Sequence, residues 1–199
     1  MAKINIANAV TVGRVFLTMG VIGLLFIPGD TIQWTAFWLT AFIIYADALD
    51  GYLARKFKLS SPFGAMLDIA GDRVVEMVYW ITFAVLGWIP LWVPLLYVVR
   101  GTFVDGIRSQ ASEKGFTPFG EKTMMQTKLG KFLVASNFSR FSYAVAKAVA
   151  FCLLIAAHTT LGKTVPLNEV AMFFVYFSCF FCVVRGLPVL VEAKSVLSQ

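Results

Sequence analysis

The chain has 199 residues, of which 59% are hydrophobic and 14% are charged. Soluble domains carry about 25% charged residues, so this composition excludes an ordinary soluble protein and indicates an integral membrane protein. The net charge of +6 does not indicate a nucleic-acid partner. The basic residues flank apolar runs, where they set orientation in the lipid bilayer and meet anionic lipid.

The apolar runs predict membrane-spanning helices along the whole chain. At about 20 residues per span, the length allows six spans and leaves no room for a separate soluble domain. We therefore expect an all-α integral membrane protein with one domain over residues 1–199. The predicted spans lie near residues 10–27, 34–55, 63–88, 92–107, 132–157 and 170–189.

A polar stripe leads into the first span. Asn5, Asn8, Thr11 and Arg14 recur at every third position, which places them along one face of a helix. Two interpretations stay open. The stripe is either a functional face or an N-terminal cap with an interfacial anchor.

Basic residues are distributed unevenly between the two ends of the predicted spans. Of the 17 lysines and arginines, only Lys163 falls in a loop on the side opposite the termini. By the positive-inside rule, both termini and the loop between the second and third spans face the cytoplasm.

Four aspartates flank that loop. Asp47 and Asp50 are three apart at the end of the second span, and Asp68 and Asp72 are four apart at the start of the third. Both spacings put the two side chains of a pair on one helical face. If the helices pack side by side, four carboxylates surround one small volume.

Ionisable groups at the membrane usually carry function. Four negative charges this close repel strongly, and either protonation or divalent cations would relieve that repulsion. Ligands that are all oxygen atoms suit Mg²⁺, Mn²⁺ or Ca²⁺ rather than zinc. A proton or ion pathway, as in a transporter, is the alternative use of such acids.

Small residues and one arginine stand beside the acids. Gly51 and Ala54 lie one turn beyond the first pair, and Gly64 lies one turn before Asp68. Arg55 offers a fixed positive charge to a phosphate. Together with metals, these residues describe a pyrophosphate site, although small residues in membrane helices also serve helix packing.

The segment reads D-x-x-D-G-x-x-A-R, then eight residues, then G-x-x-x-D-x-x-x-D. This pattern resembles the signature of the CDP-alcohol phosphatidyltransferase family. The resemblance implies transfer of a phosphatidyl group from CDP-diacylglycerol to an alcohol, with release of CMP. It also implies a cytoplasm-facing polar cavity, a homodimer and a bacterial cell membrane. The aromatic pair Tyr79–Trp80 would suit a dimer face.

The resemblance further implies roles for single residues. Two divalent cations, Mg²⁺ or Mn²⁺, would bind among Asp47, Asp50, Asp68 and Asp72. Asp72 would also be the general base that deprotonates the attacking hydroxyl. The residues expected to contact the cytidine diphosphate are Asn8, Thr11, Asp47, Gly51, Ala54, Arg55, Gly64 and Asp68.

Arginines in the later spans indicate the acceptor. Arg100 and Arg108 lie on nearly one face of the fourth span, and Arg140 begins a polar face on the fifth. Cations that point into a cavity suit a phosphorylated acceptor. The N-terminal stripe resembles the branches of the family that make phosphatidylglycerophosphate and cardiolipin. We therefore expect glycerol 3-phosphate as acceptor, with inositol phosphate or another polyol as the alternative.

Overall fold

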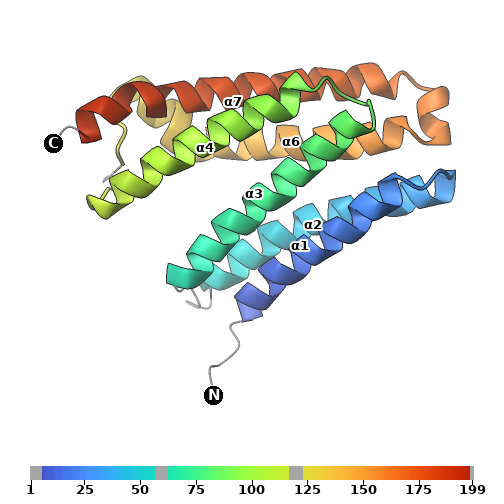
Figure 1. The fold of residues 1–199 in the computed structure, drawn as a ribbon, viewed down its shortest axis with the longest axis horizontal. Coiled ribbons are helices and arrows are strands. Elements are labelled where there is room, and N and C mark those ends of the chain that lie inside the picture. Colours follow the sequence, from blue (N-terminus) through green and yellow to red (C-terminus); the bar gives the residue numbers. More distant parts are fainter. Residues whose placement is uncertain (1–5, 57–61, 117–122, 198–199) are drawn as a thin grey trace. The chain divides into compact units, whose positions relative to one another are not determined.

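A computed structural model describes residues 6–56, 62–116 and 123–197, without the side chains of residues 6–8, 48–56, 62, 65 and 194–197. These residues form helices and no strand, which confirms the all-α prediction (Figure 1). The elements are α1 (Ile6–Leu25), α2 (Asp30–Lys56), α3 (Pro62–Val85), α4 (Trp92–Glu113), α5 (Lys128–Gly130), the π-helical turn η1 (Lys131–Ala135), α6 (Asn137–Ala157), the 3-10 turn η2 (Thr160–Lys163) and α7 (Leu167–Leu197).

Two stretches of the described chain are long and apolar enough to cross a membrane. They are Asn137–Ala157 and Leu167–Ala193, and a shorter apolar stretch covers Ala9–Leu25. These helices support the expectation of a membrane protein. The count of six spans stays a prediction.

Helix α6 begins later than the sequence predicts. The fifth span was expected from Phe132, but residues 131–135 form the turn η1 and Ser136 is extended, with φ −68° and ψ 141°. The hydroxyl of Ser136 accepts a hydrogen bond from Ser139 N at 3.2 Å. This side chain caps the new helix and so sets its start.

Helix α4 ends later than predicted. It continues past Ile107 to Glu113 and is stopped by Gly115, whose φ of 86° lies in the left-handed region. The amides of Gly115 and Phe116 return to the carbonyls of Ser112 and Ala111. Glycine adopts this conformation without strain, so the polar stretch after Ile107 remains helical until Gly115 ends it.

The contacts divide the chain into two compact units, and each is described by itself. The first unit comprises Met1–Leu91 and Phe151–Ala171, and the second comprises Trp92–Ala150 and Met172–Gln199.

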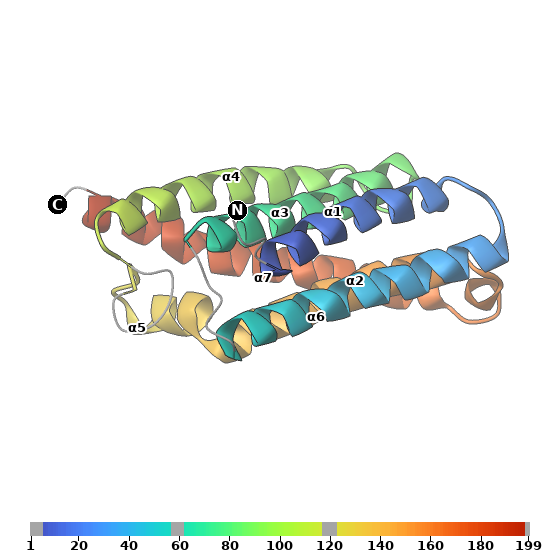
Figure 2. The same ribbon diagram turned by 90° about the horizontal axis from the view of Figure 1, so that it is seen from below.

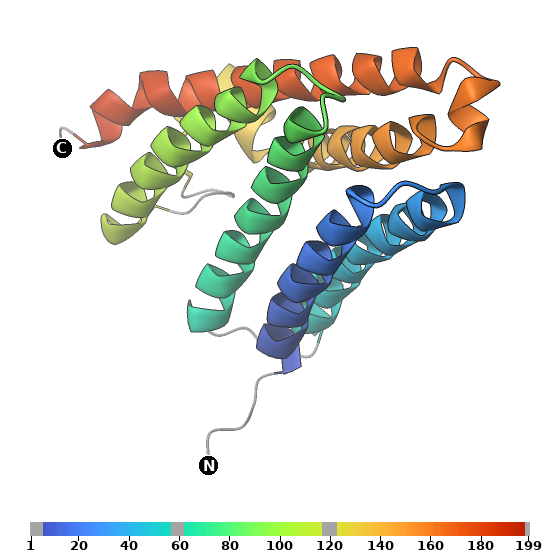
Figure 3. The same cartoon turned by 45° about the vertical axis from the view of Figure 1, so that its right-hand side comes forward.

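In the first unit, α1 lies alongside both α2 and α3 (Figure 3). The closest approach to α3 is at Gly71, where an added Cβ would stand 2.8 Å from Cγ2 of the buried Thr11. No larger residue fits there without movement, so Gly71 lets α1 pack directly on α3. Thr11 therefore faces α3 and not solvent.

An aromatic core joins α2, α3 and the end of α6. Tyr79 and Trp80 have no exposed surface. The Tyr79 ring stacks on Phe151 at 4.9 Å, and its hydroxyl is hydrogen-bonded to Thr40 Oγ1 at 2.9 Å. The expectation that Tyr79–Trp80 forms a dimer face is wrong, because both side chains are buried within the unit.

In the second unit, α7 packs against α4 and α6 (Figure 2). Tyr97 donates a hydrogen bond to Ser178 at 2.9 Å, which ties α4 to α7. Arg185 Nη1 donates to Ser139 Oγ at 2.5 Å, which ties α7 to α6. The apolar core of this unit includes Val104, Met124, Met125, Val134 and Val189.

The Gly71 contact gives a first prediction. Gly71→Ala should destabilise the protein by about 1–3 kcal/mol, because the new methyl group overpacks the contact with Thr11. Adding Thr11→Ser removes Cγ2 and should restore most of the loss. Thermal unfolding in detergent measures both. Gly20→Ala is the control, since nothing lies within 4 Å of a Cβ there. Equal effects of the two alanines would contradict the close contact.

Candidate metal and phosphate site

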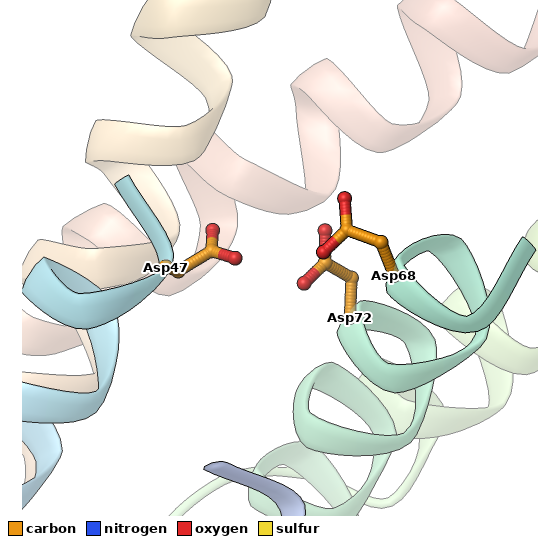
Figure 4. Close-up of side chains that lie close together, drawn as sticks. All are labelled: Asp47, Asp68 and Asp72. Atoms are coloured by element: carbon orange, nitrogen blue, oxygen red, sulfur yellow. The ribbon is translucent and has the colours of Figure 1, made fainter. Parts of the chain in front are cut away.

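Three of the four predicted aspartates lie together in the first unit. Asp47 points from α2 toward Asp68 and Asp72, which both come from α3 (Figure 4). One carboxylate oxygen from each lies within 4.8 Å of the others. Asp68 and Asp72 are exposed and Asp47 is partly buried, so a soluble ligand can reach all three.

The donor set fits a hard divalent cation. Such ions take carboxylate oxygens at roughly 2.0–2.6 Å, so two ligand oxygens on one ion lie up to about 4–5 Å apart. The separation of at most 4.8 Å matches that spacing. The exposed side of the group leaves room for water to complete the coordination. The three ligands that the described residues supply are all carboxylates, which disfavours zinc.

Several predicted site residues fall outside the described side chains. Asp50, Gly51, Ala54 and Arg55 belong to the last turns of α2, and Asn8 belongs to the first turn of α1. The roles expected for their side chains therefore stay predictions.

Two further predicted residues lie close to residues that neighbour the acids. Thr11 is buried against α3 at Gly71, the residue before Asp72. Gly64 is partly buried in the first turn of α3, one helical turn before Asp68. Their proposed contacts with the nucleotide stay untested, but both stand on the helices that carry or border the carboxylates.

Arg14, a member of the N-terminal polar stripe, belongs to this site, although the sequence predicted no binding role for it. Its Nη1 contacts Asp47 and its Nη2 contacts Asp72, so α1 supplies a cation to acids of α2 and α3. The Arg14 side chain is only 3% exposed, so the interfacial-anchor interpretation is wrong for this residue. The spacing of three from Thr11 placed Arg14 on the polar stripe, but it did not indicate that acids of α2 and α3 would be its partners.

The arginines expected to bind the acceptor all belong to the second unit. Arg100 on α4 is 8% exposed, and its Nε has no hydrogen-bond partner among the described residues. Gly186 makes room for it, because a Cβ there would stand 3.0 Å from Arg100 Cγ. Arg108 is half-buried and Arg140 is exposed.

Arg185 adds a cation that sequence reasoning missed. It lies close enough to Arg100 and Arg140 for their like charges to repel. Its guanidinium donates to the carbonyls of Leu133 and Val134 at 2.9 and 3.2 Å. Arg185 therefore holds the turn η1 in place and adds positive charge around Arg100.

Glu192, two turns further along α7, holds the segment that precedes η1. Its carboxylate accepts hydrogen bonds from Gln126 N and from Thr127 Oγ1, both at 2.5 Å. The segment 123–135 is thus fastened to α7 by one acid and one arginine. This explains how a stretch without long helices keeps a defined conformation in this unit.

Comparison with known proteins identifies related sequences. A family model described as CDP-alcohol phosphatidyltransferase matches residues 4–184. A CDP-diacylglycerol–glycerol-3-phosphate 3-phosphatidyltransferase of Pseudomonas fluorescens is 34% identical over 168 residues, which cover 79% of this chain and 85% of the relative. The enzyme of the same name from Cereibacter sphaeroides is 33% identical over 64% of this chain and 57% of its own length. A probable phosphatidylglycerophosphate synthase of Mycobacterium tuberculosis is 30% identical, over 57% of this chain and 56% of its own.

The Glu192 contacts give the second prediction. Glu192→Ala should cost the segment 123–135 about 1–3 kcal/mol of local stability, because it leaves backbone and hydroxyl donors without their acceptor. Hydrogen exchange at Gln126 and Thr127 should become faster. Glu169→Ala removes an exposed carboxylate from the first turn of the same helix and should leave that exchange unchanged. Unchanged exchange in Glu192→Ala would contradict the fastening role.

Proposed function

The chain belongs to the CDP-alcohol phosphatidyltransferase family, and on that basis we propose that it transfers the phosphatidyl group of CDP-diacylglycerol to glycerol 3-phosphate and releases CMP. This is a step of phospholipid biosynthesis. The observation that carries the proposal is the Pseudomonas fluorescens relative, whose name states this reaction and which aligns with 79% of this chain and 85% of its own length.

The aspartates form the proposed donor site. Asp47, Asp50, Asp68 and Asp72 would hold two divalent cations, Mg²⁺ or Mn²⁺. Bound cations supply charge neutralisation for the diphosphate and for the departing CMP. The remaining contacts to the cytidine diphosphate are proposed for Asn8, Thr11, Gly51, Ala54, Arg55 and Gly64, together with Asp47 and Asp68.

Asp72 is the proposed general base. A carboxylate that takes up the proton must lie within hydrogen-bond reach of the acceptor hydroxyl. The exposed position of Asp72 allows that approach, and its neighbour Asp68 lies on the same face of α3. Asp72 Oδ would accept the proton as the hydroxyl oxygen attacks the phosphorus of the phosphatidyl group. The bond from that phosphorus to the CMP oxygen then breaks.

The acceptor phosphate is proposed to bind Arg100, Arg108 and Arg140. Support comes from Arg100, which is buried with an Nε that no described residue satisfies, and from the like charges of Arg140 and Arg185 nearby. A phosphate group would relieve this repulsion and form charge-assisted hydrogen bonds. Inositol phosphate fits the same charge, but the relatives' names favour glycerol 3-phosphate.

The membrane arrangement is part of the proposal. We infer a homodimer in the bacterial cell membrane, with six spans per chain and a polar cavity open to the cytoplasm. Helices α1 to α4 have 20, 27, 24 and 22 residues, long enough for a bilayer core of about 30 Å. Their exposed aromatic side chains, such as Phe16, Trp38 and Phe103, suit contact with lipid.

The third prediction concerns metal and acceptor. The purified chain, given CDP-diacylglycerol and glycerol 3-phosphate in mixed micelles, should release CMP when Mg²⁺ or Mn²⁺ is present. EDTA should abolish the release and added Mg²⁺ should restore it, because the carboxylates alone cannot neutralise the diphosphate. Inositol phosphate, glycerol and serine serve as comparison acceptors. Release of CMP with another acceptor but none with glycerol 3-phosphate would refute the proposed substrate. Ion flux in liposomes that lack CDP-lipid would instead favour a transporter.

The fourth prediction concerns the general base. Asp72→Asn should lower turnover by roughly 10²–10⁴-fold, because the amide cannot accept the hydroxyl proton. Binding of CDP, measured by calorimetry, should largely persist. Asp30→Asn is the matched control, since Asp30 instead accepts hydrogen bonds from Thr160 in η2. An Asp72→Asn protein with full turnover would show that another group is the base.

A further inference from the structure

Arg14 occupies the space between acids that are proposed to bind metal. Its side chain is 3% exposed, whereas those of Asp47 and Asp72 are 45% and 50% exposed. The cation is therefore held on the inner side of the group, and the acids reach from it to solvent. Arg14 Nε is buried and has no hydrogen-bond partner in the described part of the chain.

The backbone at Arg14 is fixed by its surroundings. Thr11, one turn earlier on α1, packs on α3 at Gly71. Thr18, one turn later, is fully buried and donates its hydroxyl to the Arg14 carbonyl at 2.9 Å. These contacts hold the backbone of α1 in place, so a change in the partners of Arg14 requires movement of its side chain.

We propose that Arg14 is the counter-cation of the metal-free site and that it makes metal binding and donor binding depend on each other. Its guanidinium neutralises Asp47 and Asp72 until divalent cations bind, and it then turns to the diphosphate of the CDP donor. This inference rests on the proposed function, because it takes these aspartates as the metal ligands.

Arg14 and a divalent cation compete for the same carboxylate oxygens. Asp47 Oδ1 and Asp72 Oδ1 are both in contact with the guanidinium, so metal binding must weaken or break these ion pairs. A buried arginine left without an anion would be strongly destabilising. The metals alone therefore bind the free protein less tightly than bare carboxylates would.

The donor supplies the missing anion. Four aspartates and two divalent cations sum to zero charge (−4 and +4), which leaves the +1 of Arg14 without a partner. The diphosphate of the donor is an anion whose oxygens match the planar, multi-donor guanidinium. Metal and donor should thus each raise the affinity of the other, as linkage requires.

The test measures Mn²⁺ affinity of the full chain in detergent, by electron paramagnetic resonance, with and without CDP. In the wild type, CDP should increase Mn²⁺ affinity. Without nucleotide, Arg14→Gln should bind Mn²⁺ about tenfold more tightly than wild type, because charge-assisted bonds from Arg14 no longer compete with the metal for the carboxylates. The variant should also lose most of the increase in Mn²⁺ affinity that CDP causes. Arg14→Lys, a single-point donor, should fall between the two.

Arg73→Gln is the control for net charge. Arg73 lies next to Asp72 in sequence but is paired with Glu76 at 2.9 Å. The Mn²⁺ affinity of the Arg73→Gln protein should therefore stay at the wild-type value. The proposal is overturned if Arg14→Gln binds Mn²⁺ no more tightly than wild type, or if Arg73→Gln shows the same gain.

If Arg14→Gln folds poorly, a measurement of its thermal stability still tests the proposal. Saturating Mn²⁺ should raise its unfolding temperature more than that of wild type, because metal replaces the lost counter-cation, and an equal rise would contradict the proposal. Wild-type protein that binds Mn²⁺ and CDP but releases no CMP would refute the proposed reaction and leave the Arg14 comparison valid. Wild-type protein that binds no Mn²⁺ even with CDP would refute the metal site and this inference together.

Discussion

Asp47, Asp68 and Asp72 place negative charges within 4.8 Å of one another, and their repulsion acts to push α2 away from α3. A contact about two turns away in the same two helices opposes this repulsion and holds α2 and α3 together. The hydrogen bond between Thr40 and Tyr79 lies seven residues before Asp47 and seven after Asp72, which is about two turns on each helix. Because the spacing is equal, this bond and the buried Tyr79 ring fix the register that brings the acids level.

Helix α1 also offsets the repulsion between the acids, because it places Arg14 beside them. Gly71 allows Thr11 to reach α3, and this contact sets the depth at which Arg14 meets the acids. A packing contact without charge thus positions the charge that offsets the repulsion. Asp47 and Asp72 stay half exposed, since the arginine approaches them from the buried side. The arrangement of the acids and the packing of this unit therefore depend on the same three helices.

The sequence predicted what depends on the period of a single helix. The spacings within 47–50 and 68–72 were enough to predict converging carboxylates, and the family signature added their chemistry. Contacts between remote segments were not predictable in this way. Nothing in the sequence of residues 131–135 distinguishes a π-helical turn from the start of α6, because contacts of Arg185 and Ser136 determine where the helix begins. Likewise, the sequence alone favours Tyr79–Trp80 as a dimer surface, whereas in the structure Phe151 stacks on Tyr79 and Thr40 is hydrogen-bonded to it.

The two units carry side chains of opposite charge, and each set of charges suits the ligand proposed for that unit. The first unit brings carboxylates together around the buried Arg14, whereas the second contains Arg100, Arg140 and Arg185. Arginines placed beside every aspartate would form ion pairs and leave neither metal nor phosphate a binding site. Arg14 is the exception, and its pairing is reversible only if an anion is available to receive it. A donor that brings a diphosphate together with divalent metal meets this condition, which is why the proposed metal site and the proposed donor site are best understood as one electrostatic unit.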